Sequence, residues 1–325
     1  MKKLALVLLL LCAAGLALVG AQARVVAYTA HEEDIIAGMV PLCKAETGMV
    51  LEFVKLASGD VIKRVVAEAA NPQCDVIWSI GGEQLEANSG VLEKYVPKDW
   101  DKIDPVFKVG TNWLPYTGIM NVLIVNTQLV PAGRMPKGWA DLTDPWWKGK
   151  VSSATPDKSG SAYMQLNNVL LAFKDKGWDV YKEIVTNFFV ATASGAIPKY
   201  VGDGEALVGI TLEDNAFRYV QGGGPVKIIY PAEGVIAAPD GIALVKGAPH
   251  PEAAKKFIDW CLSASAQNFL VDKMTRRPVR IDGKIPAGLP PLKQVKTLPY
   301  NFAEAAKNKN DYVKKFTDLR MELGL

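Results

Sequence analysis

Two adjacent carboxylates, Glu213 and Asp214, stand between a stretch typical of a strand and a stretch typical of a helix, in the segment VGITLEDNAFRYV. Acids in this setting can help to bind a metal, or they can accept hydrogen bonds from the hydroxyls of a small molecule. They can also cap the helix that follows, in which case we expect Asp214 or Asn215 to begin it. The choice depends on the elements that position them.

Small or polar residues follow each of three apolar segments in the N-terminal half, VVAYTA, MVLEFVKL and CDVIWSI. Each loop leads into a segment with helical periodicity, and the free N–H groups of a helix start favour an anion. Serine and glycine before a helix are also ordinary caps, so no loop identifies a site on its own. The candidate ligand-binding residues from these loops are His31, Ser58, Ser79, Gly81, Gly82 and Glu83.

The same pattern recurs in the C-terminal half. The predicted strand VSSA runs into SGSAY and a long helix, and ATASG precedes a further helix and strand. These helix starts are again rich in small and hydroxyl-bearing residues, which suits an oxyanion. The candidates here are Ser159, Gly160, Ser161, Ala162, Ser194 and Gly195.

The alternation of short strands and helices determines the predicted fold class. The helix expected over residues 31–48 places Ile35, Ile36 and Met39 on one face, and a second helix is expected over 58–72. Short strands joined by helices predict a parallel sheet with right-handed crossovers, whose ligands bind at the carboxyl ends of the strands. We therefore expect an α/β protein, with a second α/β unit beginning near Lys150 and long connectors that cross between the two.

Residues 1–23 have the features of a signal peptide. Lys2 and Lys3 precede an apolar run, and Ala21-Gln22-Ala23 fits a cleavage site. A retained N-terminal anchor is the alternative, although the run is short for a membrane span of roughly 20 residues. We expect an exported protein whose mature chain of about 300 residues is long enough for two lobes.

Charge and cysteine content narrow the function classes. The whole chain has a formal net charge of +3 and two of its lysines lie in the leader, so the mature chain is near neutral and has no broad field for nucleic acid or a membrane. Cys43 and Cys74 are expected at the same end of one lobe, where a disulfide and two buried thiols are both open readings. Cys261 is the third cysteine of the mature chain, and Cys12 lies in the leader. Without a CxxC motif, a cysteine-ligated metal is not expected.

Motifs for catalysis are weak. The successive acids at 32–34 suit the dipole of a helix start, and Ser159 and Ser161 have no histidine partnered by motif. GxSxG and a glycine run followed by a P-loop lysine are absent from the sequence. Trp78 and Trp113 are candidates for the walls of a cleft. We expect a binding protein, and keep a hydrolytic enzyme as a remote alternative.

Nearly end to end, the sequence resembles a substrate-binding protein of a bacterial ABC importer, in the two-lobed type II class that includes the ferric-ion-binding proteins. The resemblance rests on pieces that are individually weak but occur in a specific order: VVAYTAHEED, SGSAY, GDGEALVGITLED, YPAEG and RRPVR. It implies two lobes, each a mixed, mostly parallel sheet flanked by helices, that close over a ligand about hinge strands. The implied divisions are residues 24–120 with 230–283, residues 121–229, and a helical tail over 284–325 that packs across the second lobe.

The resemblance also implies a partner and a location. Proteins of this class deliver a small solute to an ABC permease in the inner membrane, from the periplasm. It further implies a monomer that needs no cofactor and binds no nucleic acid.

The resemblance limits the classes of ligand to consider. Ferric-binding members use a histidine, a glutamate and two adjacent tyrosines, and His31 and Glu83 match the first two positions. Glu213 and Asp214 stand where the tyrosine pair should be, and the nearest tyrosine, Tyr219, falls in the helix that follows. Two phenolates supply much of the affinity for a hard cation such as Fe³⁺, so their loss argues against iron. A ferric site of His31, Glu83 and Asp214 stays the alternative.

The closer resemblance is to the subgroup that includes binders of sugar phosphates and related organophosphates or phosphonates. In that reading the phosphate lies on the hydroxyls and N–H groups of residues 159–162, and Ser194 and Gly195 close around it. Glu213, Asp214 and Glu233 accept hydrogen bonds from ligand hydroxyls, and His31 donates to either end. No arginine for the phosphate is obvious from the sequence, but backbone donors can bind an oxyanion.

Overall fold

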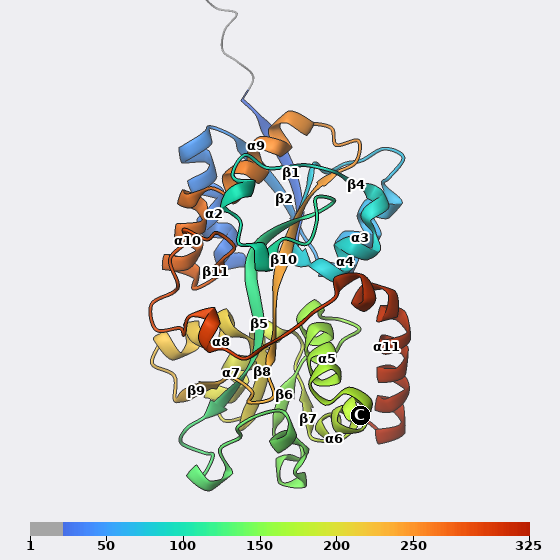
Figure 1. Ribbon diagram of the computed structural model, residues 1–325, viewed down its shortest axis with the longest axis vertical. Coiled ribbons are helices and arrows are strands. Elements are labelled where there is room, and N and C mark those ends of the chain that lie inside the picture. Colours follow the sequence, from blue (N-terminus) through green and yellow to red (C-terminus); the bar gives the residue numbers. More distant parts are fainter. Residues whose placement is uncertain (1–21) are drawn as a thin grey trace, which may run out of the picture.

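A computed structural model describes residues 22–325, and it shows two lobes joined by two long strands (Figure 1). The predicted leader lies outside the described residues, apart from its last two positions. None of the helices within residues 22–325 combines the length and the apolar character that crossing a membrane requires.

The first lobe is built on three parallel strands, as the sequence predicts. β1 (Arg24–Thr29) lies between β2 (Val50–Lys55) and β3 (Val76–Gly81), and each of the two pairs is parallel. Two helices make the crossovers, α2 (Glu33–Thr47) and α3 (Ser58–Ala67). The carboxyl ends of these strands therefore meet at one edge of the sheet.

Both faces of this sheet are buried because neighbouring strand residues point to opposite sides. Ala27 and Trp78 pack with α2, α9 (Pro251–Cys261) and α10 (Ala264–Met274) on one face. Tyr28 and Ile77 pack with α3 on the other. A strand buried on both faces reads as a continuous apolar run, which explains why VVAYTA and CDVIWSI lack a polar alternation.

The second lobe repeats the α/β arrangement around a separate apolar core. β6 (Val151–Ser153) pairs in parallel with β7 (Phe188–Val190) and with β8 (Val208–Leu212). The remaining elements of this lobe are β9 (Val226–Ile229), α5 (Gly160–Phe173), α6 (Gly177–Thr186), α7 (Ile197–Gly202) and α8 (Glu213–Gln221).

Two long strands, β5 (Leu114–Asn126) and β10 (Val235–Val245), run through both lobes. The sheet order is β2-β1-β3-β10-β5-β8-β6-β7, so this antiparallel pair stands between the first three strands and the last three. At the crossing Pro239 of β10 faces Gly118 of β5. Proline has no N–H to donate and glycine adds no side chain, and the register of β10 shifts nearby, between Asp240 and Gly241.

The C-terminal tail bridges the lobes. Helix α11 (Phe302–Leu323) packs on α4 (Gly82–Ala87) of the first lobe and on α5 and α6 of the second. Short strands complete the fold: β4 (Leu92–Glu93) and β12 (Thr297–Leu298) pair with β10, and β11 (Arg277–Pro278) pairs with β5. The residue boundaries of the lobes stay a prediction.

Three sequence readings are resolved by burial. Trp78 and Trp113 are 0% and 1% exposed, so they belong to the core and do not form cleft walls. Cys43, Cys74 and Cys261 are buried free thiols, which favours the reading without a disulfide. Burial raises the pKa of all three thiols, so their thiolate form is disfavoured.

Candidate functional site

A cavity of about 1390 Å³ lies between the lobes, with walls from both. Its walls come from the loops after β1 and β3, from the starts of α3, α4 and α5, and from one face of α11. This is the place predicted from strand polarity, because ligands of such sheets bind beyond the carboxyl ends of the strands.

Three serine hydroxyls, from Ser159, Ser161 and Ser194, meet on the wall of the second lobe; they are called the serine cluster below. The hydroxyl oxygens of Ser159 and Ser161 are 3.0 Å apart, and Ser161 donates to Ser194 Oγ at 2.9 Å. All three residues line the cavity and are partly exposed to it. A hydroxyl that now bonds a neighbouring hydroxyl can turn to donate to a ligand instead.

Local structure explains why these serines converge. Ser159 is the N-cap of α5, with extended backbone, and its Oγ accepts the N–H of Ala162 at 3.3 Å. Asn121 of β5 donates to the carbonyl of Ser161, and Thr211 of β8 donates to the carbonyl of Ser194. Both serine loops are thus attached to the central strands. Gly160, Gly195 and the serine cluster line the cavity, whereas Ala162 does not.

The facing wall, in the first lobe, carries Ser58, Ser79, Gly81 and Gly82. Ser58 opens α3, and Gly82 opens the short helix α4. Ser79 has a left-handed backbone (φ 58°), and its hydroxyl donates to Asp240 at 2.5 Å. Its hydrogen-bonding capacity is therefore used mainly within the protein.

His31 lines the cavity but is only 1% exposed. Its Nε2 lies 3.3 Å from the hydroxyl of Tyr116, and its Nδ1 lies 3.4 Å from Glu32 Oε2. The ring also packs edge-on against Trp78. Both nitrogens thus have partners inside the first lobe, and the ring serves as part of the wall.

Glu83 is 4% exposed and accepts a hydrogen bond from the hydroxyl of Tyr300, which precedes α11. Burial raises the pKa of its carboxyl above the ordinary value, although the Tyr300 hydrogen bond and Lys309 oppose this. Glu83 therefore joins α4 of the first lobe to the start of the bridging tail.

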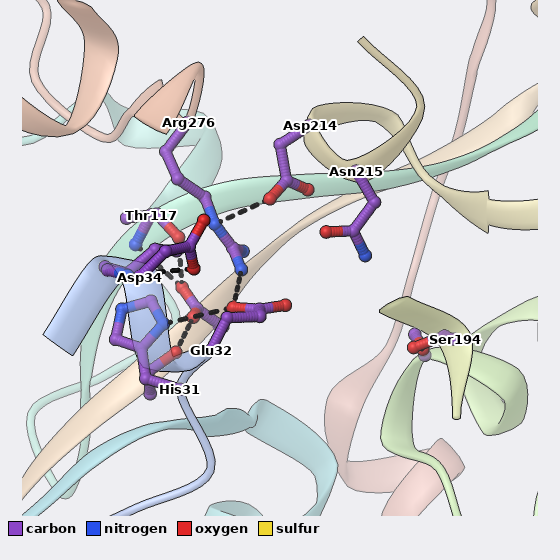
Figure 2. Close-up of polar contacts among 12 residues, drawn as sticks. His31, Glu32, Asp34, Thr117, Ser194, Asp214, Asn215 and Arg276 are labelled. Atoms are coloured by element: carbon purple, nitrogen blue, oxygen red, sulfur yellow. Dashed lines mark hydrogen bonds and ion pairs between the residues drawn. The ribbon is translucent and has the colours of Figure 1, made fainter. Parts of the chain in front are cut away.

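Arg276 lies between the carboxylates of Asp214 and Glu32, and these three residues are called the arginine cluster below (Figure 2). Its Nε is 2.9 Å from Asp214 Oδ2, and its Nη2 is 3.0 Å from Glu32 Oε2. The arginine side chain is 4% exposed and that of Asp214 is 6% exposed. Because Asp214 is in the first turn of α8 and the other two belong to the first lobe, the cluster joins the lobes across one side of the cleft.

The pKa values of the two carboxylates move in opposite directions. Burial raises the pKa of Asp214 even though Arg276 lies beside it. Burial also disfavours ionisation of Glu32, but Arg276 and His31 outweigh it and hold the pKa of Glu32 below its usual range. The positive charge of Arg276 is thus already balanced within the protein.

The remaining predicted acids lie elsewhere. Glu213 receives two hydrogen bonds from Arg277, at 2.6 and 2.8 Å, and one from the hydroxyl of Tyr230. Glu233 accepts the N–H groups of Trp139 and Ala140 at 3.1 and 2.9 Å. Neither residue lines the cavity, and neither does Asp214. The structure thus differs from the prediction that these three acids face ligand hydroxyls.

Capping does not explain the acids either. Helix α8 begins at Glu213 after Leu212, and the side chain of Leu212 forms no cap. Glu213 and Asp214 are in its first turn, where negative charge suits the helix dipole, but their carboxylates are bound by arginines.

Sequence reasoning missed the basic residues of the cavity wall, of which Arg276 and Lys309 are at least partly buried, whereas Lys55, Lys63 and Lys158 are exposed. Arg276 belongs to the RRPVR segment, which was recognised in the sequence but not placed. Lys309 lies mid-way along α11, and its place depends on the packing of that helix across the lobes. Asp240 was also missed, and it accepts from Ser79 and from the N–H and hydroxyl of Thr117.

The alternative ferric set does not come together as a metal site. Across residues 22–325, no group of three or more His, Cys, Asp or Glu side chains is placed to hold a metal ion. Asp214 is bound by Arg276, and Glu83 is bound by Tyr300. Each would have to give up its partner before it could bind a cation.

The family model for "Bacterial extracellular solute-binding protein" matches residues 75–307. Among the curated relatives, the "Putative 2-aminoethylphosphonate-binding periplasmic protein" of Salmonella typhimurium is 29% identical over 252 residues, which are 73% of this chain and 71% of that protein.

Two solved structures share the fold. The periplasmic binding protein AfuA of Actinobacillus pleuropneumoniae, with fructose-6-phosphate bound, has a TM-score of 0.85 and 24% identity over 92% of this chain and 98% of that one. Iron-bound HitA from Pseudomonas aeruginosa has a TM-score of 0.80 and 20% identity over 93% and 100%.

These likenesses confirm the predicted two-lobed fold of a periplasmic binding protein and the prediction that the chain is not an enzyme. The chain belongs to the bacterial extracellular solute-binding protein family, and it is a periplasmic solute-binding protein of the kind that serves ABC importers.

Proposed function

We propose that the protein captures a small phosphorylated sugar, or a related organophosphate or phosphonate, in the interlobe cavity and delivers it to an ABC permease. The observation that carries this proposal is the serine cluster at the start of α5, on the cavity wall. A monomeric protein and an anionic ligand are parts of the same proposal.

The serine cluster suits a phosphate or phosphonate group for two reasons. Its three hydroxyls can each donate one hydrogen bond to an oxyanion. The N–H groups of the first helical turn, at Gly160 and Ser161, have no partner within a helix and point toward its start, where the dipole favours negative charge. Hydrogen bonds to a charged oxygen are about twice as strong as neutral ones, so a few of these donors suffice.

The other wall supplies room and further polar groups for the rest of the ligand. The starts of α3 and α4 lie opposite the serine cluster, with Ser58, Gly81 and Gly82 on the surface. A cavity of about 1390 Å³ is large enough for a phosphorylated sugar with water, since ligand pockets commonly measure about 300–1,000 Å³.

The comparisons support this class of ligand without identifying one member. One relative is named for 2-aminoethylphosphonate, and the AfuA structure contains fructose-6-phosphate. Iron is also represented, by HitA. The arrangement of Asp214 with Arg276 and of Glu83 with Tyr300 favours the organophosphate reading over iron.

A thermal-shift panel on the purified mature protein tests the proposal. The compounds are hexose phosphates, phosphoglycerate, 2-aminoethylphosphonate, the matching unphosphorylated sugars, and ferric ion with carbonate or phosphate. A ligand at 100 times its dissociation constant should add about 2.7 kcal/mol to the free energy of unfolding. We expect this shift with at least one phosphorylated or phosphonate compound. A large shift with ferric ion and none with the organophosphates would overturn the proposal.

A further inference from the structure

Lys309 stands on the face of α11 that forms one side of the cavity. Phe302, Ala306, Lys309 and Val313 line the cavity, at the spacing of one helical face. Lys309 is therefore directed toward the cavity by the packing of the whole helix against α4 and α5.

Lys309 packs on α5, the helix whose start carries the serine cluster, and lines the same cavity as the cluster. Its Nζ is 5.5 Å from the centre of the Tyr163 ring, and Tyr163 is one turn from Ser159 in α5. The hydroxyl of Tyr163 donates to the carbonyl of Ala305 at 2.5 Å, which holds α11 against α5 at this point. Side chains of a helix lean toward its N-terminus, so the Tyr163 side chain lies over the turn that begins at Ser159.

The ammonium group of Lys309 is held by a neutral partner. With its amide oriented to satisfy both atoms, Gln84 donates to the carbonyl of Ser58 at 2.9 Å and accepts from Lys309 Nζ at 3.0 Å. Lys309 forms none of the ion pairs found among residues 22–325, and the acid that acts on its charge, Glu83, is bonded to Tyr300. Burial lowers the pKa of Lys309, because the charged form has lost hydration.

The other basic residues of the cavity wall are less suited to neutralise a ligand. Arg276 is balanced by Asp214 and Glu32. Lys55 pairs with Glu33 and Lys63 lies 3.6 Å from Asp60, both at exposed positions. Lys158, next to Ser159, also lines the cavity, but it is exposed, so its ammonium group keeps its hydration. A partly desolvated ammonium without a carboxylate partner gains the most from an arriving anion.

We propose that Lys309 is a ligand-binding residue, which leaves the Gln84 amide and neutralises the phosphate or phosphonate group held by the serine cluster. The inference rests on the function proposed above. It makes α11 part of the binding site, so that the tail contacts the ligand as well as both lobes. It also makes Lys309 a determinant of specificity for dianionic over monoanionic groups, because the benefit of a full positive charge grows with the charge of the ligand.

Isothermal titration of three variants tests this inference. Lys309→Gln removes the charge, Lys309→Arg keeps it, and Lys307→Gln is the matched control at an exposed position of the same helix. The probes are the phosphate ester that binds the wild type and the corresponding sulfate ester, which has the same shape and one negative charge fewer.

We expect Lys309→Gln to bind the phosphate ester about 10- to 100-fold more weakly, the loss typical of a hydrogen bond to a charged group. The loss for the sulfate ester should be smaller, and the preference for phosphate over sulfate should fall. Lys309→Arg should keep most of the affinity, and Lys307→Gln should match the wild type. If Lys309→Gln folds poorly, Lys309→Met provides a second uncharged variant whose chain can lie on the Tyr163 ring.

Two outcomes would overturn the inference while leaving the proposed function intact: a Lys309→Gln affinity within twofold of the wild type, or an equal loss for phosphate and sulfate esters. Failure of the proposed function has a different signature. In that case the wild type itself binds none of the phosphorylated or phosphonate probes, and the inference falls with it.

Discussion

The two sides of the cleft treat charge in opposite ways. On one side, the arginine cluster places one buried guanidinium between two carboxylates from different lobes. On the other, the hydrogen bonds of the serine cluster run to hydroxyls and backbone groups, and Lys309, which lines the same cavity, bonds a glutamine amide. On the first side the charges are balanced within the protein, whereas the second side has hydrogen-bond donors that can turn to a ligand.

This difference shows why the presence of acids in a sequence says little about their availability. Glu213 and Asp214 follow a strand that ends at the cleft, as ligand-binding acids would. They are occupied by Arg277 and Arg276, which come from a segment more than sixty residues later in the chain. The hydroxyls of the serine cluster bond only weaker, neutral partners, so their local pattern is the more dependable signal.

The largest effect on stability is expected from Arg276→Met. The substitution leaves Asp214 and Glu32 without their shared cation, and breaking a buried ion pair on one side costs about 3–5 kcal/mol. We expect a loss of this size in the free energy of unfolding, measured by urea denaturation. Arg276→Met combined with Asp214→Leu is the control and should recover part of the loss, since a whole buried pair can be replaced by apolar residues. A loss below about 1 kcal/mol in the single variant would show that the pair is not effectively buried.

On the opposite side, Ser161→Glu should abolish ligand binding without a comparable loss of stability. The carboxylate places like charge and bulk where the serine cluster would hold a phosphate, and we expect affinity to fall by at least about 100-fold, or about 2.7 kcal/mol. Titration with the phosphorylated compound that binds the wild type measures the effect. Ser89→Glu, outside the cavity lining, is the matched control. Retained affinity in Ser161→Glu would remove the serine cluster as the anion site.

Glu83→Gln tests how the buried Glu83 carboxyl makes the stability of the protein depend on pH. Burial raises the folded-state pKa of Glu83, so its contribution to stability is fully present below the unfolded pKa of about 4.3 and is lost as pH rises through the folded pKa. Glutamine does not ionise and has no such loss. The thermal midpoint of Glu83→Gln minus that of the wild type should therefore increase as pH rises from 4 to about 7.5.

Tyr300→Phe is the companion to this measurement. It removes a hydrogen bond that lowers the Glu83 pKa, so it should make the stability loss on raising the pH larger than in the wild type. If the difference in thermal midpoint between Glu83→Gln and the wild type stays constant with pH, the pKa of Glu83 is not raised in the folded protein.

The smallest effect is expected at Arg218, which also links the lobes. Its Nη1 is 2.6 Å from Asp34 Oδ2, but the two side chains are 24% and 58% exposed. Exposed ion pairs contribute about 0.2–1 kcal/mol, so Arg218→Gln should reduce the free energy of unfolding by no more than this amount. A double-mutant cycle with Asp34→Asn isolates the pair. A coupling energy as large as the loss at Arg276 would contradict the contrast between buried and exposed links.

The sequence predicted the elements of the first lobe well because their signals are local. The strands ending at Thr29 and Lys55 follow from apolar runs over a few residues, and α3 follows from its helical periodicity. Ser58 was expected to cap α3, but it is the first helical residue, and Ala57 precedes it without a side-chain cap. The place of the serine cluster on the cavity followed for the same reason, from strand polarity and helix starts.

The errors in the prediction come from contacts between distant segments. Trp78 lies within β3, and its side chain points to the face covered by α9, as alternation along the strand requires. The partners of Glu233 are the backbone N–H groups of Trp139 and Ala140, and no sequence motif predicts this contact. Lys309 reaches the cavity only because α11 packs on both lobes.

The pairing of Pro239, which has no N–H, with Gly118 has a practical consequence for following this protein in solution. If bending concentrates at one rung of the β5–β10 ladder, the movement of the lobes has effectively one coordinate, and a single interlobe distance describes it. A donor and acceptor dye at exposed positions on the two lobes, such as Val66 in α3 and Leu171 in α5, would then report occupancy by energy transfer. The fold would thereby provide an optical sensor whose signal needs no label on the solute.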